Sequence, residues 1–295
     1  MIEGCAAHSG QSGGSGAPSA SADDTISNVM LVRGATVVAV VIAAAHLAAC
    51  GGKTDRDRSG GADECDGEIA FADPRLEGAV RDAIGRPTGP IRGDDVADLS
   101  ELNADMLEIS DLSGIECLRG LIRLYVGDNT VYSDGLGDLG DGHDPALEIS
   151  DLSPLSGLTR LTWLIVCGHS ISDLSPLAEV TSLTRIDLGD NLIDDLGPLA
   201  SLTSLTILVA DSNEVEDLTP LAALSSLQEV YLRSNRISDL SPLVAGPALG
   251  SDDLVDLTSL VSDPRHDPNP IDCIEQAENI QTLRDRGVDV EIDCP

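Results

Sequence analysis

The sequence has very few aromatic residues and few positive charges. It contains one Trp, three Tyr and one Phe in 295 residues, so a packed core must be built from Leu, Ile, Val and Ala. Lys and Arg total 17 against 51 Asp and Glu, and the net charge is −34. Little in such a chain could neutralise phosphates, which excludes nucleic acid as a partner. The acidity is typical of a solvated surface, with divalent cations or a basic partner as the alternative.

Common catalytic motifs are also missing from the sequence. It has no His-Glu-x-x-His and no phosphate-binding Gly-x-x-x-x-Gly-Lys, the patterns that would indicate a zinc protease or a nucleotide-binding enzyme. His143, His169 and His266 are far apart in sequence and have no clear nucleophile partner. We therefore expect no enzyme activity, no cofactor and no metal site.

The first part of the chain has the features of an export segment. Residues 1–29 are rich in Gly, Ser and Ala without periodicity, which is typical of disorder. Arg33 then precedes an apolar run at 35–45, which predicts a signal peptide at 30–49 and is too short to span a membrane comfortably. Residues 1–29 are thus either disordered or an extension ahead of a true start at Met30.

The signal segment ends in Leu47-Ala48-Ala49-Cys50-Gly51. This resembles the lipobox of bacterial lipoproteins, which implies that Cys50 is lipidated and becomes the mature N-terminus; ordinary signal cleavage is the alternative. Several acyl chains on one residue give firm anchoring. By the same resemblance Gly51 implies the outer membrane or surface of a Gram-negative cell, so we expect a cell-envelope location. Residues 50–64 are then the lipidated Cys and a flexible tether.

One 22-residue pattern is repeated along the rest of the chain. Four copies start at Ile149, Ile171, Ile193 and Val215, a fifth begins at Ile237 and loses the pattern, and an earlier one starts at Ile109. A fixed period of this size predicts a solenoid, in which each unit buries its apolar face only against its neighbours.

Each copy divides into a predicted strand, turn and helical arm. The L-x-L part alternates with period two, as expected of a strand with one buried face. The Asn that follows can hydrogen-bond turn backbone, so stacked copies would align a ladder. Its members are Asn129, Asn191, Asn213 and Asn235, with His169 in the same position of one copy. The D-L-S-P-L arm carries proline in register, which predicts a turn or 3-10 segment rather than a second strand.

These residues resemble the leucine-rich repeat superfamily, and the 22-residue form with D-L-S-P-L is similar to the internalins. The resemblance covers residues 65–295. It implies an α/β solenoid with short parallel strands on the concave face, 3-10 or turn segments on the convex face, a helical N-cap and a helix–strand C-cap. The N-cap and a first divergent repeat occupy 65–108, the repeats 109–260 and the C-cap 261–295. For function it implies only that the chain binds some partner.

Local sequence signals predict the two caps of the solenoid and the pairing of the cysteines. Asp73-Pro74 starts a helix that ends at Gly85, and an apolar stripe from Ile274 to Leu283 predicts a second helix before an alternating strand. Cys273 and Cys294 flank that last helix and strand, and we pair them. We also pair Cys65 in the N-cap with Cys117 in the first clear repeat, which leaves Cys167 as the free thiol.

An insertion at 131–148 interrupts the period. Its aspartates suggest calcium, but aligning Gly142 and Glu148 to an EF-hand loop places Gly137 and Leu139 where acidic ligands belong. We therefore predict a plain acidic loop, with a calcium site as the alternative.

The strand residues between the core leucines vary from copy to copy, and they should face the concave surface. Exposed Trp, Tyr and Arg dominate interface energies. The predicted partner-binding residues are Tyr125, Trp163, Arg185, Asp187, Asp211, Glu229, Tyr231 and Arg233. We expect a monomer that is anchored through its N-terminal lipid and binds an unknown protein ligand. The alternative is a structural envelope lipoprotein without a specific partner.

Overall fold

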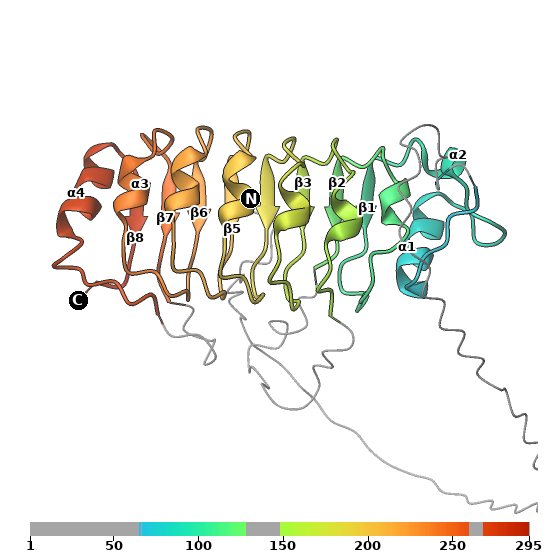
Figure 1. Cartoon of the computed structure of the whole chain (residues 1–295), viewed down its shortest axis with the longest axis horizontal. Helices are drawn as coiled ribbons and strands as arrows, with labels where there is room; N and C mark the ends of the chain where they lie inside the picture. The colour runs from blue at the N-terminus through green and yellow to red at the C-terminus, as the bar shows by residue number, and fades with distance from the viewer. Residues whose placement is uncertain (1–64, 66, 128–147, 260–267, 295) are drawn as a thin grey trace, which may run out of the picture. The chain divides into compact units, whose positions relative to one another are not determined.

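The computed structural model describes residues 65, 67–127, 148–259 and 268–294. In this part of the chain, short parallel strands form one sheet in strict chain order (Figure 1). They are β1 (Glu101–Asn103), β2 (Arg123–Tyr125), β3 (Trp163–Ile165), β4 (Arg185–Asp187), β5 (Ile207–Val209), β6 (Glu229–Tyr231), β7 (Leu254–Asp256) and β8 (Asp289–Glu291). The predicted solenoid with parallel strands is confirmed.

The strands pair in register through their central residues. Leu124 lies opposite Leu164, and Leu164 opposite Ile186. These central side chains are fully buried, so each coil stacks its leucines on those of the next. Because a period of two sends the flanking residues to the other side, the first and third residues of each strand, with the residue two positions further on, form a second surface. We call this surface the outer strand face.

Helical turns return the chain from one strand to the next, as the prolines predicted. The 3-10 segments are η2 (Ile115–Cys117), η5 (Ser153–Leu155), η6 (Ser175–Leu177), η7 (Gly197–Ser201) and η8 (Thr219–Ala223). Proline lies in the first turn of the last four of these segments, η5 to η8, where its missing N–H costs no hydrogen bond. The arm after β6 differs from the prediction, because it is a short α-helix, α3 (Ser241–Ala245).

The predicted asparagine ladder is present at three of its four positions. Asn213 Oδ1 accepts from Ile193 N at 2.9 Å, and its Nδ2 donates to Leu188 O at 3.0 Å. Asn191 and Asn235 make the corresponding bonds in their own copies, whereas Asn129 lies outside the described residues. Each side chain therefore joins two consecutive coils through groups that would otherwise be buried without partners.

The ladder includes two further residues. His169 substitutes for Asn, since its Nδ1 accepts from Ile149 N at 3.3 Å and its Nε2 lies 2.7 Å from Val126 O. Asn269 continues the ladder beyond the last regular copy, accepting from Ile237 N at 3.0 Å and donating to Leu232 O at 2.9 Å. The sequence pattern missed Asn269 because a longer segment separates it from the preceding coil.

The N-terminal cap begins with helix α1 (Pro74–Ala83), as predicted. Asp73 caps it by accepting from Arg75 N at 2.8 Å, and its other oxygen accepts from Ser110 N at 2.9 Å in the first repeat. The same carboxylate thus starts the helix and ties it to the stack. A second short helix, α2 (Gly93–Val96), was not predicted.

The C-terminal cap is helix α4 (Ala277–Asp285) followed by β8. Ile280 and Leu283 are buried, as the apolar stripe predicted, but Ile274 is 88% exposed. Ile274 was wrongly placed in the stripe because it precedes the helix, in a turn where its N–H donates to Asp272 Oδ1 at 2.9 Å.

Both predicted disulfides are present, Cys65–Cys117 in the N-cap and Cys273–Cys294 in the C-cap. Cys167 is also disulfide-bonded, so the prediction that it is a free thiol was wrong. That prediction counted only the cysteines of the folded part, and it left out Cys5 and Cys50, which lie outside the described residues. The odd count therefore did not require a free thiol.

Several predictions concern residues outside the described part of the chain. They are the disordered or extension segment 1–29, the signal peptide 30–49, the tether with Cys50, and nearly all of the acidic insertion. Within the described ranges, no helix has the length and apolar character needed to cross a membrane.

Asn213→Ala tests the ladder. The substitution leaves the buried Ile193 N without a partner and removes one of the two side-chain donors to Leu188 O, which keeps its bond from Asn191 Nδ2, so we expect a loss of about 2 kcal/mol in the free energy of unfolding. The measurement is the urea unfolding midpoint. Asn103→Ala is the control, because Asn103 is exposed and caps only Asp105 N at 3.1 Å. Equal midpoints for the two variants would contradict a structural role for the ladder.

Candidate functional site

The outer strand face carries an aromatic–arginine cluster formed by Arg123, Tyr125, Trp163 and Arg185. Trp163 opens β3, and the sheet register places it between Arg123 on β2 and Arg185 on β4. Arg185 Cζ lies 4.7 Å from the Trp163 ring centroid, and Arg123 Cζ lies 5.9 Å from it. Guanidinium groups at these distances are attracted by the face of the ring.

Tyr125 completes the cluster, with its ring centroid 6.3 Å from that of Trp163 and an angle of 42° between the planes. Tyr125 and Trp163 are half-buried, and the side chain of Arg123 is 50% exposed. Trp163 Nε1 is buried and has no hydrogen-bond partner among the described residues. An indole N–H in this state costs free energy that an acceptor from a partner would recover.

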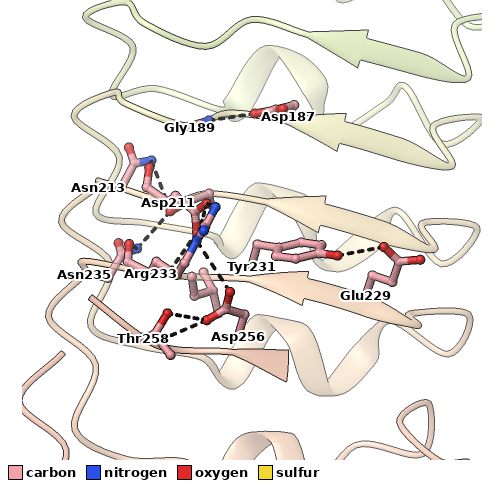
Figure 2. A network of polar contacts seen from close by, with 12 residues as sticks. Asp187, Gly189, Asp211, Asn213, Glu229, Tyr231, Arg233, Asn235, Asp256 and Thr258 are labelled. Atoms are coloured by element: carbon pink, nitrogen blue, oxygen red, sulfur yellow. Dashed lines mark hydrogen bonds and ion pairs between the residues drawn. The ribbon is translucent and has the colours of Figure 1, made fainter. Parts of the chain in front are cut away.

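A second group on this face, the Asp211–Arg233–Asp256 cluster, is held together by charge (Figure 2). Arg233 Nη2 donates to Asp211 Oδ2 at 2.6 Å and its Nε lies 3.6 Å from Asp256 Oδ2. Asp256 Oδ1 also accepts from Thr258 N at 3.0 Å. Both carboxylates are 5% exposed. The charged groups of this cluster are paired with one another, and the cluster links the chain segments that follow β5 and β6 to β7.

The electrostatics of this cluster depend on the arginine. Burial raises the pKa of Asp211 above its usual value, hydrogen bonding and the charge of Arg233 oppose the rise, and the charge of Asp256 adds to it. Arg233 therefore offsets part of the cost of burying Asp211 beside a second carboxylate, an arrangement that like charges alone would disfavour.

Tyr231 lies beside this cluster, and its hydroxyl donates to Glu229 Oε2 at 3.1 Å (Figure 2). Burial and the charge of Glu229 raise the pKa of Tyr231 well above its usual range. Tyr231 is 7% exposed. Its ring packs on the sheet, and the hydroxyl stays protonated at any physiological pH.

The structure places the predicted partner-binding residues on the predicted face but corrects their exposure. Arg185, Asp187, Asp211 and Tyr231 are buried rather than exposed. Asp187, for example, turns back to accept from Gly189 N at 3.1 Å. Neighbouring strands lie only about 4.8 Å apart, so polar side chains here find partners on the sheet itself. The members still accessible are Tyr125, Trp163, Glu229 and Arg233.

Arg123 was not among the predicted binding residues, although it lies on the outer strand face and is the most exposed member of its cluster. The signal that could have found it is its register position, directly opposite Trp163.

As for metals, the described residues contain no group of three or more His, Cys, Asp or Glu side chains placed to hold an ion.

Comparison with known proteins gives one matching family profile, described as leucine-rich repeats in two copies, over residues 181–223. No curated protein matches the chain. Among solved structures, internalin C2 of Listeria monocytogenes is 31% identical over 60% of this chain and 92% of its own, with a TM-score of 0.37. A second Listeria monocytogenes internalin, InlF, is 25% identical over 63% and 71%, with a TM-score of 0.34. A leucine-rich repeat protein of Leptospira interrogans is 17% identical over 61% and 39%, with a TM-score of 0.45.

Arg233→Met tests the Asp211–Arg233–Asp256 cluster. Removing the guanidinium leaves two facing carboxylates in a buried site, so we expect a loss of about 3 kcal/mol at neutral pH. The folded-state pKa of Asp211, already raised by burial, then lies further above the unfolded value, so folding favours the protonated form. The lost stability should therefore return as the pH is lowered from neutral, which thermal unfolding at several pH values measures.

Arg236→Met is the matched control. Arg236 pairs with Glu214 at 3.0 Å, but their side chains are 55% and 37% exposed. Exposed pairs contribute roughly 0–1 kcal/mol, so this variant should change little at any pH. A loss in Arg233→Met that does not depend on pH, or that equals the control, would show that the cluster is not held by charge.

Proposed function

This chain is a leucine-rich repeat protein, and from that premise we propose that it binds another protein through the aromatic–arginine cluster of its outer strand face. The observation that carries the proposal is the position of Trp163. The only tryptophan of a chain with five aromatic residues lies outside the leucine core, on a face where the strand residues vary from copy to copy.

The chemistry of the cluster fits an interface. Trp, Tyr and Arg are the residue types most enriched among residues whose truncation costs the most binding energy. Here two guanidinium groups and one tyrosine ring surround the indole, so the cluster is held in shape before binding. A surface organised in advance loses less conformational entropy when a partner docks.

The repeats themselves argue for binding rather than catalysis. Their invariant leucines and asparagines are buried in the scaffold, and the strand surface is extended rather than a deep apolar cleft of the kind that small substrates use. Repeat proteins commonly use such extended surfaces to contact other macromolecules. The identities of Arg123 and Trp163 therefore set the specificity, while the scaffold sets their spacing.

We also propose that a lipid on Cys50 holds this module at a membrane, in the cell envelope of a Gram-negative bacterium. The support is the sequence Leu47-Ala48-Ala49-Cys50-Gly51 after an apolar segment, followed by a polar tether. A tether of 14 residues, 51–64, lets the repeats reach a partner some distance from the bilayer, roughly 20 Å for a flexible chain.

Site-specific photocrosslinking tests the binding face. With a crosslinking residue in place of Ile207, which lies opposite Arg185 on β5 and outside the cluster, we expect one reproducible protein adduct on intact cells, and Trp163→Ala in the same background should reduce its yield by at least about tenfold. A crosslinker in place of Glu179, which is exposed just after η6, is the control and should give no such adduct. Equal adducts from both positions, or a yield unaffected by Trp163→Ala, would contradict the proposed face.

Cys50→Ser tests the anchor separately. Without the thiol no thioether to a lipid forms, so we expect the protein to move from the membrane fraction to the soluble fraction of lysed cells. Cys5→Ser should leave it in the membrane fraction. Membrane association that survives Cys50→Ser would exclude Cys50 as the anchor without affecting the proposal for the binding face.

A further inference from the structure

A cavity of about 540 Å³ lies beside the Cys65–Cys117 disulfide, where the N-cap meets the first repeats. Its charged lining residues are Arg92, Asp94, Arg119 and Arg160. They come from the start of α2 and from the turns that precede β2 and β3. We call it the arginine cavity. Three guanidinium groups against one carboxylate make its lining positive, in a protein whose net charge is −34.

Two of these arginines have no acidic partner in the part of the chain that the structure describes. Six other described arginines pair with carboxylates, in Arg75–Glu108, Arg81–Glu77, Arg86–Asp95, Arg123–Glu101, Arg233–Asp211 and Arg236–Glu214, and Arg284 and Arg286 donate to backbone carbonyls. Among the described residues, the guanidinium groups of Arg92 and Arg160 have neither an ion pair nor a hydrogen bond. Arg119 already has an interaction partner, so the unpaired guanidinium groups are those of Arg92 and Arg160. In a chain with three acids for every base, two such groups facing one cavity indicate a place for an external anion.

The repeat scaffold does not require an arginine at position 160. Later copies have serine there, at Ser182, Ser204 and Ser226. Ser182 Oγ donates to Leu161 O at 2.6 Å and so helps to join neighbouring coils. Arg160 replaces that hydroxyl with a charged group that reaches the cavity. Such a departure from the repeat, at a position where the scaffold uses a small hydroxyl, is best explained by a role outside the scaffold.

The walls of the cavity are held rigidly. A Cβ atom on Gly93 would lie 2.5 Å from Cys65 O, and one on Gly120 would lie 2.7 Å from Ala97 O. The backbone therefore approaches too closely for any other residue at these two lining positions, within the cap at Gly93 and between the cap and the first repeat at Gly120. The disulfide joins the same two walls covalently. The arginines thus project from a preorganised frame, which lowers the entropic cost of binding.

We propose that the arginine cavity binds a small molecule carrying a tetrahedral oxyanion, namely a phosphate or sulfate ester. Planar guanidinium groups donate paired N–H bonds to such oxygens, and this geometry makes arginine the usual ligand for them. The volume lies within the range of small-molecule sites, roughly 300–1,000 Å³. The cavity therefore has room for an ester of the size of a sugar phosphate rather than for the anion alone.

Calorimetric titration of the full chain with its disulfides intact tests this proposal. The probes are glucose 6-phosphate, glucose 6-sulfate and glucose, at low ionic strength. We expect at least one ester to bind saturably and glucose not to bind. If the phosphate ester binds more tightly than the sulfate ester, the ligand class is a phosphate; the reverse order identifies a sulfate.

Three variants separate the cavity from general charge effects. Arg92→Ala and Arg160→Ala should each weaken ester binding by about tenfold or more, whereas Arg236→Ala, which removes the same charge elsewhere, should not. Asp94→Asn removes the only carboxylate of the lining and should tighten binding by about threefold, a gain that damage to the fold would not produce. Thermal unfolding confirms that each variant is folded.

The proposal is overturned if neither ester binds saturably, if Arg236→Ala weakens binding as much as the cavity variants do, or if Asp94→Asn leaves the affinity unchanged or lower. None of these results bears on the outer strand face, which the crosslinking experiment tests independently.

Discussion

The fold depends on the side-chain amide that each asparagine shares between two consecutive coils. Leucines alone cannot hold the register, because every coil offers the next much the same apolar surface. Asn213 removes this ambiguity, because from its own coil it accepts from Ile193 N and donates to Leu188 O, and both of these groups lie in the preceding coil. Such buried polar networks specify one arrangement when every member is satisfied. His169 and Asn269 make equivalent bonds, so the rule is kept even where the residue or the spacing changes.

This constraint separates scaffold from function. Positions that build the coil cannot vary without leaving buried backbone groups unpaired, so any chemistry must be placed where the coil tolerates change. Two such places stand out, and both use arginine, the scarce charge of this chain. On the outer strand face Arg123 and Arg185 lie against Trp163; at the N-cap Arg92 and Arg160 line a cavity. Several aspartates, by contrast, cap turns, as Asp173 does for Ser175 N at 2.8 Å.

The period was sufficient to predict the strands of the regular copies, the proline-led 3-10 turns and the ladder, because each follows from a spacing that repeats. Both cap disulfides were predicted from the positions of the cysteines in and beside the caps. Features without a repeat were missed: α2 is too short to show periodicity, and Ile274 fits an apolar stripe yet precedes the helix. The burial of Arg185, Asp187, Asp211 and Tyr231 could not be predicted either, since it depends on partners one strand away. The arginine cavity was invisible for the same reason, because α2 is more than 60 residues from Arg160 in sequence and only the stacking brings them together.

The central claim is that a partner contacts Trp163 on the outer strand face. Because Trp163 is the only tryptophan, a chain labelled with fluorotryptophan has a single fluorine NMR resonance from this site. Addition of the partner recovered by crosslinking should shift or broaden that resonance in proportion to the bound fraction. A resonance that stays unchanged while size-exclusion chromatography shows the complex has formed would contradict the claim and move the binding surface elsewhere on the repeats.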